Sequence, residues 1–256
     1  MKILNTISIN LKRKIMLNIV VPIAGKSYFF DENKDGFPKP FIEICGKTML
    51  EHFVENFSSI ENKRFIFILQ ERENKKFHID DAILVLTNNA SEIITLKNET
   101  GGMVCSVMMA VDFIENDEPL LVVNMDQVFE LDLNEMIEKF KPYDAGVLSF
   151  ESVHPRWAYV KCNSEGFVLQ AYEKQPVSKN AIAGFYYFKN GKYFMNAAKI
   201  MIKKDVNYGG QYFIAPLLNE LILENKSVFN ISIDKNSYYT FYSPAKINEY
   251  ERIKNA

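Results

Sequence analysis

The residues best suited to chemistry follow the first apolar segment of the chain. Residues 17–24 have the composition of a buried strand and run into Gly25-Lys26-Ser27. Backbone amides of a glycine-containing loop at a strand end can meet phosphate oxygens, and lysines supply positive charge. Lys39 stands between two prolines, which restrict the backbone and direct the ammonium group. The pattern suits a nucleoside triphosphate, although solvated surface charges are the alternative for Lys26 and Lys39.

Asp126 is the second candidate for chemistry. It follows the apolar run 120–125, and ligands of open α/β sheets gather at the carboxyl ends of the strands. A carboxylate at this place predicts a Mg²⁺ ligand, because Mg²⁺ takes oxygen donors and commonly one or two carboxylates beside substrate phosphates. The residues alone leave a second interpretation open, in which Asp126 caps the next helix or begins a turn.

Two further segments place glycines or charges at the ends of predicted elements. Gly101 and Gly102 precede a helix pattern, where they let a backbone approach a nucleobase closely or only relax the entry to the helix. Glu173 and Lys174 stand at a strand end, where an exposed charge pair is otherwise unremarkable.

Three residues of the later strands are possible contacts for an acceptor substrate, namely Arg156, Trp157 and Tyr187. Aromatic residues in such strands are, however, more often part of the core. The three histidines have no metal-ligand spacing, and His52, on an amphipathic helix pattern, is predicted to be structural.

Taken in order, these segments resemble the sugar-phosphate nucleotidyltransferase family. The family's glycine loop, Pro-Lys-Pro lysine and Gly-Lys-Pro-Met-type helix start correspond to residues 16–50. Its base-reading loop corresponds to 100–107, its metal-binding aspartate to 124–127, and its Glu-Lys-Pro element with the next strand to 173–188. The resemblance covers most of the chain from Met16 to about Ala215.

The resemblance implies attack of an acceptor phosphate oxygen on the α-phosphorus of a nucleoside triphosphate, with release of pyrophosphate. It implies a Mg²⁺ cofactor bound by Asp126 and three catalytic residues, which are Lys26, Lys39 and Asp126. The implied nucleotide-binding residues are Ala24, Gly25, Lys26, Lys39, Thr100, Gly101, Gly102 and Asn124. The implied acceptor-binding residues are Glu173, Lys174, Gly184 and Tyr187.

Within the family, the sequences Pro-Ile-Ala-Gly at 22–25 and Asn-Met-Asp-Gln at 124–127 resemble a small bacterial branch that acts in capsule and surface-polysaccharide pathways. This implies a cytidylyltransferase that uses CTP, with phosphorylated glutamine as the first acceptor candidate. The alternatives are a uridylyl- or thymidylyltransferase acting on a hexose 1-phosphate, and a nucleotide-binding protein without turnover.

The chain departs from the family pattern at two places. Residues 25–29 lack the second glycine and the arginine of the family's loop, a role that Lys26 is expected to take in part. Near Thr240, where the family has a second metal-binding acidic or amide residue, no carboxylate stands. Mg²⁺ would then be held by Asp126, the triphosphate and water, unless another acid such as Asp234 reaches the site.

Composition narrows the class of protein. The chain has 256 residues, 48% of them hydrophobic, and a net charge of −2, which gives no electrostatic reason to expect nucleic acid as a partner. Three widely spaced cysteines favour reduced thiols and a cytoplasmic protein, and no apolar run reaches the length of a membrane span. We expect residues 1–15 to be an N-terminal extension and residues 16–256 to form one domain. Composition leaves the oligomeric state open.

Hydrophobic patterns predict the elements that position these residues. Strands are expected at 17–24, 64–69, 82–86, 120–124, 145–150, 157–162, 167–172, 183–189 and 228–233, with a hairpin turn at 163–166. Helices are expected near 48–57, 103–114, 192–203 and 212–224, and from 244. This order, with the resemblance, implies a single-domain α/β fold of Rossmann-like (GT-A-like) type, with a mixed, mostly parallel central sheet flanked by helices.

Overall fold

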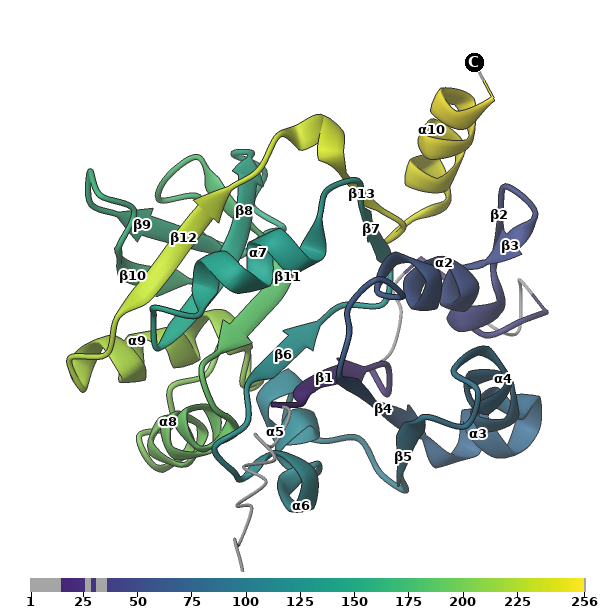
Figure 1. Ribbon diagram of the computed structural model, residues 1–256, viewed down its shortest axis with the longest axis horizontal. Helices are drawn as coiled ribbons and strands as arrows, with labels where there is room; N and C mark the ends of the chain where they lie inside the picture. Colours follow the sequence, from purple (N-terminus) through teal and green to yellow (C-terminus); the bar gives the residue numbers. More distant parts are fainter. Residues whose placement is uncertain (1–14, 26–28, 31–35, 256) are drawn as a thin grey trace, which may run out of the picture.

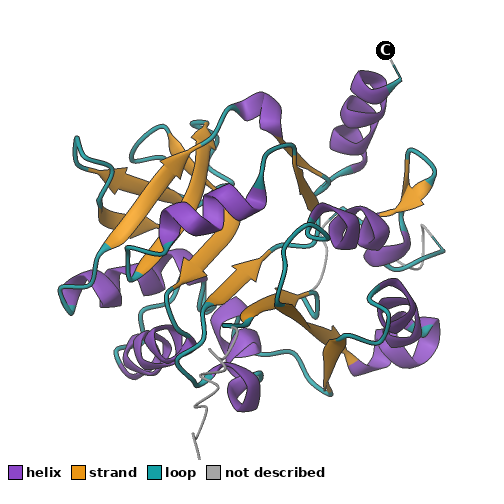
Figure 2. Ribbon diagram, viewed as in Figure 1, coloured by secondary structure: helices purple, strands orange, loops and turns teal. Residues whose placement is uncertain are grey.

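A nine-stranded mixed sheet forms the centre of the molecule (Figures 1 and 2). The computed structural model describes residues 15–25, 29–30 and 36–255. The strands follow the order β10-β9-β11-β6-β1-β4-β5, with β8 beside β11 and β12 beside β8. They are β1 (Leu17–Pro22), β4 (Lys63–Gln70), β5 (Ser91–Leu96), β6 (Leu120–Val123), β8 (Ala145–Glu151), β9 (Tyr159–Cys162), β10 (Val168–Tyr172), β11 (Asn180–Phe188) and β12 (Val228–Ser232).

The part of the sheet around β1 is parallel. β1 pairs in parallel with β4 and β6, and β4 pairs in parallel with β5. On the other side of β6, strand β11 runs antiparallel to β6, β8 and β9. β6 is a continuous apolar run, and β1 is interrupted only by Asn18, because helices cover both faces of the sheet. The predicted α/β fold with a mixed, mostly parallel central sheet is confirmed.

The helices lie over two hydrophobic cores, one on each face of the sheet (Figure 1). The core on the first face receives side chains from α2 (Met49–Asn56), α4 (Ile79–Leu86), α7 (Leu133–Phe140) and α10 (Pro244–Lys254). The core on the second face receives side chains from α5 (Met103–Met108), α6 (Val111–Ile114), α8 (Gly191–Lys203) and α9 (Ile214–Leu223). The remaining helices are α3 (Glu71–Phe77) and two 3₁₀ turns, η1 (Lys39–Phe41) and η2 (Lys235–Ser237).

Local side chains set where several helices begin. Thr48 caps α2, and its hydroxyl accepts from the backbone N–H of Glu51 while the Glu51 carboxylate accepts from the Thr48 backbone N–H. Asp132 and Asn190 cap α7 and α8, and their side-chain oxygens accept from backbone N–H groups of the first turn. His52 Nε2 bonds to the Ile44 carbonyl oxygen at 2.7 Å, so its predicted structural role is confirmed.

Two small sheets complete the fold. β7 (Gln127–Phe129) pairs antiparallel with β13 (Tyr238–Thr240), which brings the C-terminal segment beside the residues that follow β6. β2 (Glu43–Ile44) pairs antiparallel with β3 (Lys47–Thr48). The predicted hairpin at 163–166 is confirmed by the antiparallel pairing of β9 with β10.

Two expectations about elements were wrong, and several short elements had not been predicted. Residues 82–86, predicted as a strand, belong to helix α4, and the strand that pairs with β4 is the less apolar β5. A short apolar run fits either element, and here Asp80 and Asp81 in the first turn favour the helix. Residues 103–114 form two short helices rather than one. The strands β2, β3, β5, β7 and β13 and the helices α3 and α7 had not been predicted.

None of the helices in the described residues has the length and apolar composition that crossing a bilayer requires.

Candidate active site

An ion pair lies at the carboxyl end of the parallel strands. Lys39 Nζ donates to Asp126 Oδ2 at 2.6 Å, although the two residues are 87 positions apart in the chain. Both side chains are mostly buried, with 27% and 18% of their surfaces exposed. Lys39 begins the turn η1 after Pro38, and Asp126 follows β6. The structure therefore brings together the lysine and the carboxylate that the sequence predicted to be catalytic.

The backbone of Asp126 is held by the C-terminal segment. Its carbonyl oxygen accepts from the Phe241 backbone N–H at 2.8 Å and from the Thr240 hydroxyl at 3.3 Å. These contacts follow from the pairing of β13 with β7, which aligns Thr240 with Gln127. The segment expected to carry a second metal ligand thus reaches Asp126, but it offers a threonine hydroxyl that already bonds to the backbone.

Asn124, Gly184 and Gln127 form a tightly packed group next to this pair. The backbone N–H of Asn124 and the side-chain amide of Gln127 both donate to the Gly184 carbonyl oxygen, each at 3.0 Å. The Tyr238 hydroxyl donates to Gln127 Oε1 at 3.1 Å. Burial raises the pKa of the Tyr238 phenol, and the nearby Asp126 charge raises it further. The phenol is thereby kept protonated as a donor.

Replacing Gly184 with alanine is expected to lower the free energy of unfolding by about 2–4 kcal/mol. Gly184 has φ of +59°, and an added Cβ would lie 2.4 Å from Asn124 Nδ2 and 2.8 Å from Gln127 Oε1. Gly209 is a matched control, because its φ is +60° and nothing lies within 4 Å of an added Cβ. Urea unfolding should show a loss of only about 1 kcal/mol for Gly209→Ala. Equal losses in the two variants would contradict the packing role of Gly184.

The predicted base-reading loop is closed by another part of the chain. Gly102 has φ of +124°, and an added Cβ would lie 2.6 Å from the backbone nitrogen of Tyr212. The Tyr212 backbone N–H donates to the Gly101 carbonyl oxygen at 2.8 Å. The Thr100 hydroxyl donates to the Gly102 carbonyl oxygen at 3.0 Å. The close approach that Gly102 permits is therefore made by the Tyr212 backbone, which adds a third explanation to the two that the sequence left open.

Glu173 and Lys174 follow β10 and face different surroundings. Glu173 is half-buried, and loss of water around its carboxylate raises the pKa of Glu173 to about 7. The positive charge of Lys174 opposes part of this rise. Its charge also adds to the rise in the pKa of the buried Tyr186 phenol. Lys174 directs its ammonium over the rings of Tyr208 and Phe213, at 5.4 and 5.0 Å from their centroids.

The stability of the protein should depend on pH through Glu173. Its pKa is raised from 4.5 to about 7, so the folded state binds more protons than the unfolded state between these values. The stabilisation from protonated Glu173 is therefore complete below about pH 4.5 and is lost as the pH rises through 7. The Glu173→Gln variant should gain up to about 3 kcal/mol relative to wild type from pH 5 to pH 8.

Urea unfolding at pH 5, 6, 7 and 8 measures this difference. The exposed Glu165, in the turn between β9 and β10, provides the control, and Glu165→Gln should follow the wild-type dependence on pH. Parallel curves for wild type and Glu173→Gln would show that burial does not perturb Glu173.

Tyr187 corrects one of the predicted acceptor contacts. It is 2% exposed and stacks on Phe140, with ring centroids 5.6 Å apart, in the core under α7. Burial raises its pKa to about 12. Its neighbour Tyr186 points to the opposite face, because successive residues of a strand alternate. The prediction of Tyr187 as an acceptor contact was wrong.

The predicted phosphate loop is described only in part. Ala24 is half-buried after β1, and Gly25 is exposed, with open space around the position of a Cβ. Lys26, predicted to be catalytic and to bind nucleotide, lies outside the described residues.

The residues around Asp126 fit Mg²⁺ with a single protein carboxylate. No group of three or more His, Cys, Asp or Glu residues within the described part of the chain is arranged to hold a metal ion. Asp234 is engaged as the cap of η2, where it accepts from the Asn236 backbone N–H at 2.7 Å. Mg²⁺ is commonly bound by one or two carboxylates together with substrate phosphates and water. Asp126 would hold the ion in this way once phosphates are present.

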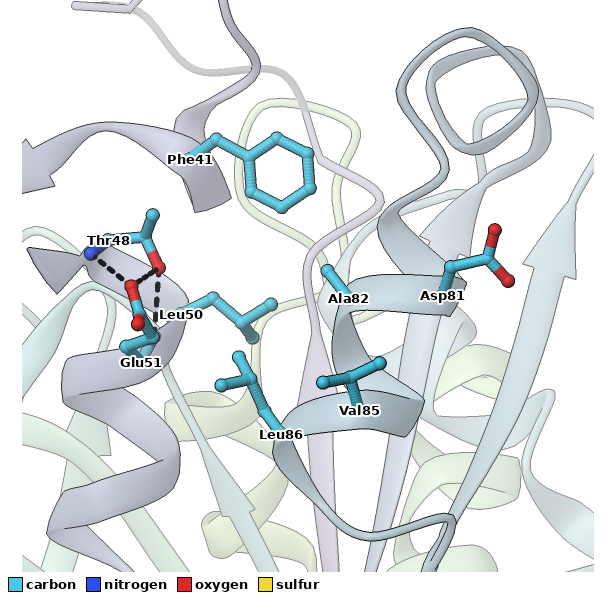
Figure 3. Close-up of a pocket in the computed structure, with 8 residues that line it drawn as sticks. All are labelled: Phe41, Thr48, Leu50, Glu51, Asp81, Ala82, Val85 and Leu86. Carbon is cyan, nitrogen blue, oxygen red and sulfur yellow. Dashed lines mark hydrogen bonds between the residues drawn. The ribbon is translucent and has the colours of Figure 1, made fainter.

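A separate pocket of about 360 Å³ lies between α2 and α4 (Figure 3). In Figure 3, Leu50, Val85 and Leu86 point into it, and the Thr48 and Glu51 capping pair lies at its edge. The described residues that line it include no lysine or arginine. The pocket therefore does not suit a triphosphate, and the site remains at Lys39 and Asp126.

Sequence reasoning missed the structural roles of Gln127 and Tyr212. Gln127 is 1% exposed and links Gly184 to Tyr238. A buried amide directly after Asp126 was visible in the sequence, but its partners come from β11 and β13. Tyr212 acts on Gly101 through its backbone, which leaves no signal in residue type.

Sequence comparison matches most of the chain to a known family. The sequence model of a family described as "Nucleotidyl transferase" matches residues 35–235, a range that includes Lys39, Asp126, Glu173 and Lys174 but begins after Gly25. A curated relative, the bifunctional protein GlmU of Methanocaldococcus jannaschii, is 26% identical over 214 residues, which cover 82% of this chain and 48% of the relative. The chain spans about half the length of the curated relatives it matches.

Solved structures share the fold. The nucleoside-diphosphate-sugar pyrophosphorylase of Vibrio cholerae RC9 aligns with a TM-score of 0.75 and 23% identity, over 91% of this chain and 99% of that chain. The inositol-1-phosphate CTP transferase of T. maritima aligns with a TM-score of 0.74 and 12% identity, over 94% of this chain and 96% of that chain. At these identities the likeness shows a common architecture.

Proposed function

The chain belongs to the nucleotidyl transferase family, and from this premise we propose that it transfers a nucleoside monophosphate from a nucleoside triphosphate to a small phosphorylated acceptor. The observation that carries the proposal is the ion pair of Lys39 with Asp126 at the carboxyl ends of β1 and β6. A mostly buried cation and carboxylate at this edge of an α/β sheet are suited to phosphates and their counter-ion.

In the proposed reaction the protein has to position the two substrates and neutralise their charge. The second pKa of a phosphate monoester is about 6, so the acceptor is already an anion near neutral pH and needs no general base. Lys39 neutralises charge on the triphosphate and stabilises the charge that develops on pyrophosphate as it leaves. Asp126 holds Lys39 in place before substrate arrives. Mg²⁺, when bound at Asp126, supplies further neutralisation of the phosphate oxygens.

The preferred donor in this proposal is CTP, and the first acceptor candidate is phosphorylated glutamine. The altered loop at 25–29, the lack of a carboxylate at Thr240 and the retained Glu173-Lys174 element support a family chemistry applied to an unusual acceptor. A solved structure with the same fold is named a CTP transferase. The proposed setting is cytoplasmic, in capsule or surface-polysaccharide biosynthesis.

A second candidate function is nucleotidyl transfer to a sugar 1-phosphate. It is favoured by the curated relatives named GlmU and by the solved nucleoside-diphosphate-sugar pyrophosphorylase. Selection of cytosine over uracil requires a partner for the exocyclic amine, and backbone carbonyls can supply it without any trace in side-chain identity.

A matrix of donors and acceptors, read by pyrophosphate release with Mg²⁺, tests the proposal. CTP, UTP, dTTP, ATP and GTP are each combined with phosphorylated glutamine, glucose 1-phosphate and N-acetylglucosamine 1-phosphate. We expect the highest kcat/KM for CTP with phosphorylated glutamine. Efficient use of UTP or dTTP with a sugar 1-phosphate, and no use of CTP with phosphorylated glutamine, would replace the first candidate with the second. Release of pyrophosphate in the absence of any acceptor would contradict both candidate functions.

A further inference from the structure

Arg156, in the connection between β8 and β9, is held by aromatic rings from three parts of the chain. Its guanidinium carbon lies 3.0 Å from the ring centroid of Tyr242, 5.0 Å from that of Trp157 and 5.9 Å from that of Phe29. The rings of Tyr242 and Phe29 also contact one another, with centroids 5.7 Å apart. Stacking on aromatic faces restrains a guanidinium and leaves the N–H donors at its edge available for hydrogen bonds.

The charge of Arg156 is not neutralised by a carboxylate in the described part of the chain. Its only hydrogen bond there is made by its backbone N–H, to His154 Nδ1. Arg64 provides a contrast, because its guanidinium donates to Asn18 Oδ1 and lies 4.0 Å from a Glu118 oxygen. A half-buried guanidinium whose donors have no partner among residues 15–25, 29–30 and 36–255 suits an anionic ligand.

The ring of Tyr242, on which the Arg156 guanidinium stacks, belongs to the segment that holds Asp126. Tyr242 directly follows Phe241, whose backbone N–H donates to the Asp126 carbonyl oxygen. The buried Tyr238 phenol responds to both charges, since Asp126 raises its pKa and Arg156 lowers it. Arg156 therefore stands next to the predicted site for the reacting phosphates, as a cation additional to Lys39.

We propose that Arg156 binds a carboxylate of the acceptor and so selects acceptors that carry a carboxylate in addition to their phosphate. A planar guanidinium binds a carboxylate through two parallel N–H···O bonds, which a lysine cannot reproduce. The reacting phosphates already have Lys39 as a cation in the proposed site. A hexose 1-phosphate has no second anion for Arg156. The inference rests on the proposed function and adds to it the class of acceptor.

The test compares phosphorylated glutamine with the same compound whose α-carboxylate is converted to a primary amide. Wild type should prefer the carboxylate form by about 10–100-fold in kcat/KM, the usual scale for a hydrogen bond between charged groups. Arg156→Met should remove this preference by slowing only the carboxylate acceptor. Arg156→Lys should retain a small part of it. Arg252, an exposed arginine in the last turn of α10, is the matched control, and Arg252→Met should behave as wild type.

The ratio between the two acceptors separates recognition from packing. If removal of Arg156 only loosens Tyr242, the variant should use both acceptors more slowly by the same factor, and the ratio of their kcat/KM values should not change. That result would overturn the inference but not the proposed function. Calorimetric binding of both acceptors, with a non-hydrolysable CTP analogue present, is the second readout. An Arg156-dependent preference in binding without pyrophosphate release would support the inference and contradict the proposed function. If neither acceptor binds and no pyrophosphate is released, both the inference and the proposed function are contradicted.

Discussion

Asp126→Asn should lower nucleotidyl transfer by about 10³-fold or more while the protein stays folded. The substitution removes the carboxylate charge that neutralises Lys39 and that would hold Mg²⁺ against the phosphates. A metal ion contributes several kcal/mol of charge stabilisation in such reactions, and 1.36 kcal/mol corresponds to a factor of ten in rate. The fold should survive, because the contacts of Asp126 with Thr240 and Phe241 are made by its backbone carbonyl oxygen.

Steady-state pyrophosphate release at saturating substrates measures this effect. Asp117→Asn is the control, because the Asp117 side chain is 82% exposed and pairs with Lys192 at the surface. The variant Lys39→Ala/Asp126→Asn distinguishes two roles of the carboxylate. If Asp126 only positions Lys39, the double variant should be no slower than Lys39→Ala, whereas an independent role in binding Mg²⁺ makes it slower. Wild-type activity of Asp126→Asn with Mg²⁺ present would remove Asp126 from the site.

Lys39→Ala should reduce kcat by about 10²–10³, the usual scale for loss of one preorganised group that stabilises developing charge. Pro38 and Pro40 restrict the backbone on both sides, and the ammonium is mostly buried against Asp126. Lys39→Arg should also be impaired, because a wider guanidinium does not replace a compact ammonium in a mostly buried setting.

The changes that Lys39→Ala causes in kcat and in KM distinguish a catalytic role of Lys39 from a role in binding. A loss in kcat shows stabilisation of the transition state, while a loss confined to KM, with kcat unchanged, would reduce Lys39 to uniform binding of phosphate. Lys192→Ala, which removes an exposed lysine paired with Asp117, should leave both parameters unchanged.

The sequence predicted the strands that are buried on both faces. β1, β4 and β6 consist largely of buried apolar residues, so their pattern is unambiguous. β5 carries mostly half-buried residues in Ser91–Leu96, and its apolar content was lower than that of the neighbouring helix α4. Periodicity in a five-residue run could not separate the two. β7 and β13 are each three residues long and stabilise one another across more than 100 residues of sequence, which no local pattern reveals.

Within the site, residue types predicted Lys39 and Asp126, but the burial of Tyr187 could not be predicted. Side chains of β11 alternate regularly between the two cores, with Ala183, Phe185 and Tyr187 on one face and Ile182, Tyr186 and Phe188 on the other. Helices from distant parts of the chain cover both faces, and Tyr187 stacks on Phe140 of α7. The raised pKa of Glu173 and the stacking of Arg156 depend on burial by distant segments and were likewise beyond the sequence.

The central claim is that an acceptor phosphate attacks the α-phosphorus of the nucleotide, and ³¹P NMR of the reaction mixture tests it most directly. With CTP, Mg²⁺ and phosphorylated glutamine, the account predicts loss of the three triphosphate signals and the appearance of two coupled signals from a new diphosphate linkage, together with free pyrophosphate. Lys39→Ala and Asp126→Asn should show neither product over the same time. Formation of CDP with a phosphoryl group on the acceptor, or of CMP and pyrophosphate without a new linkage, would contradict the account.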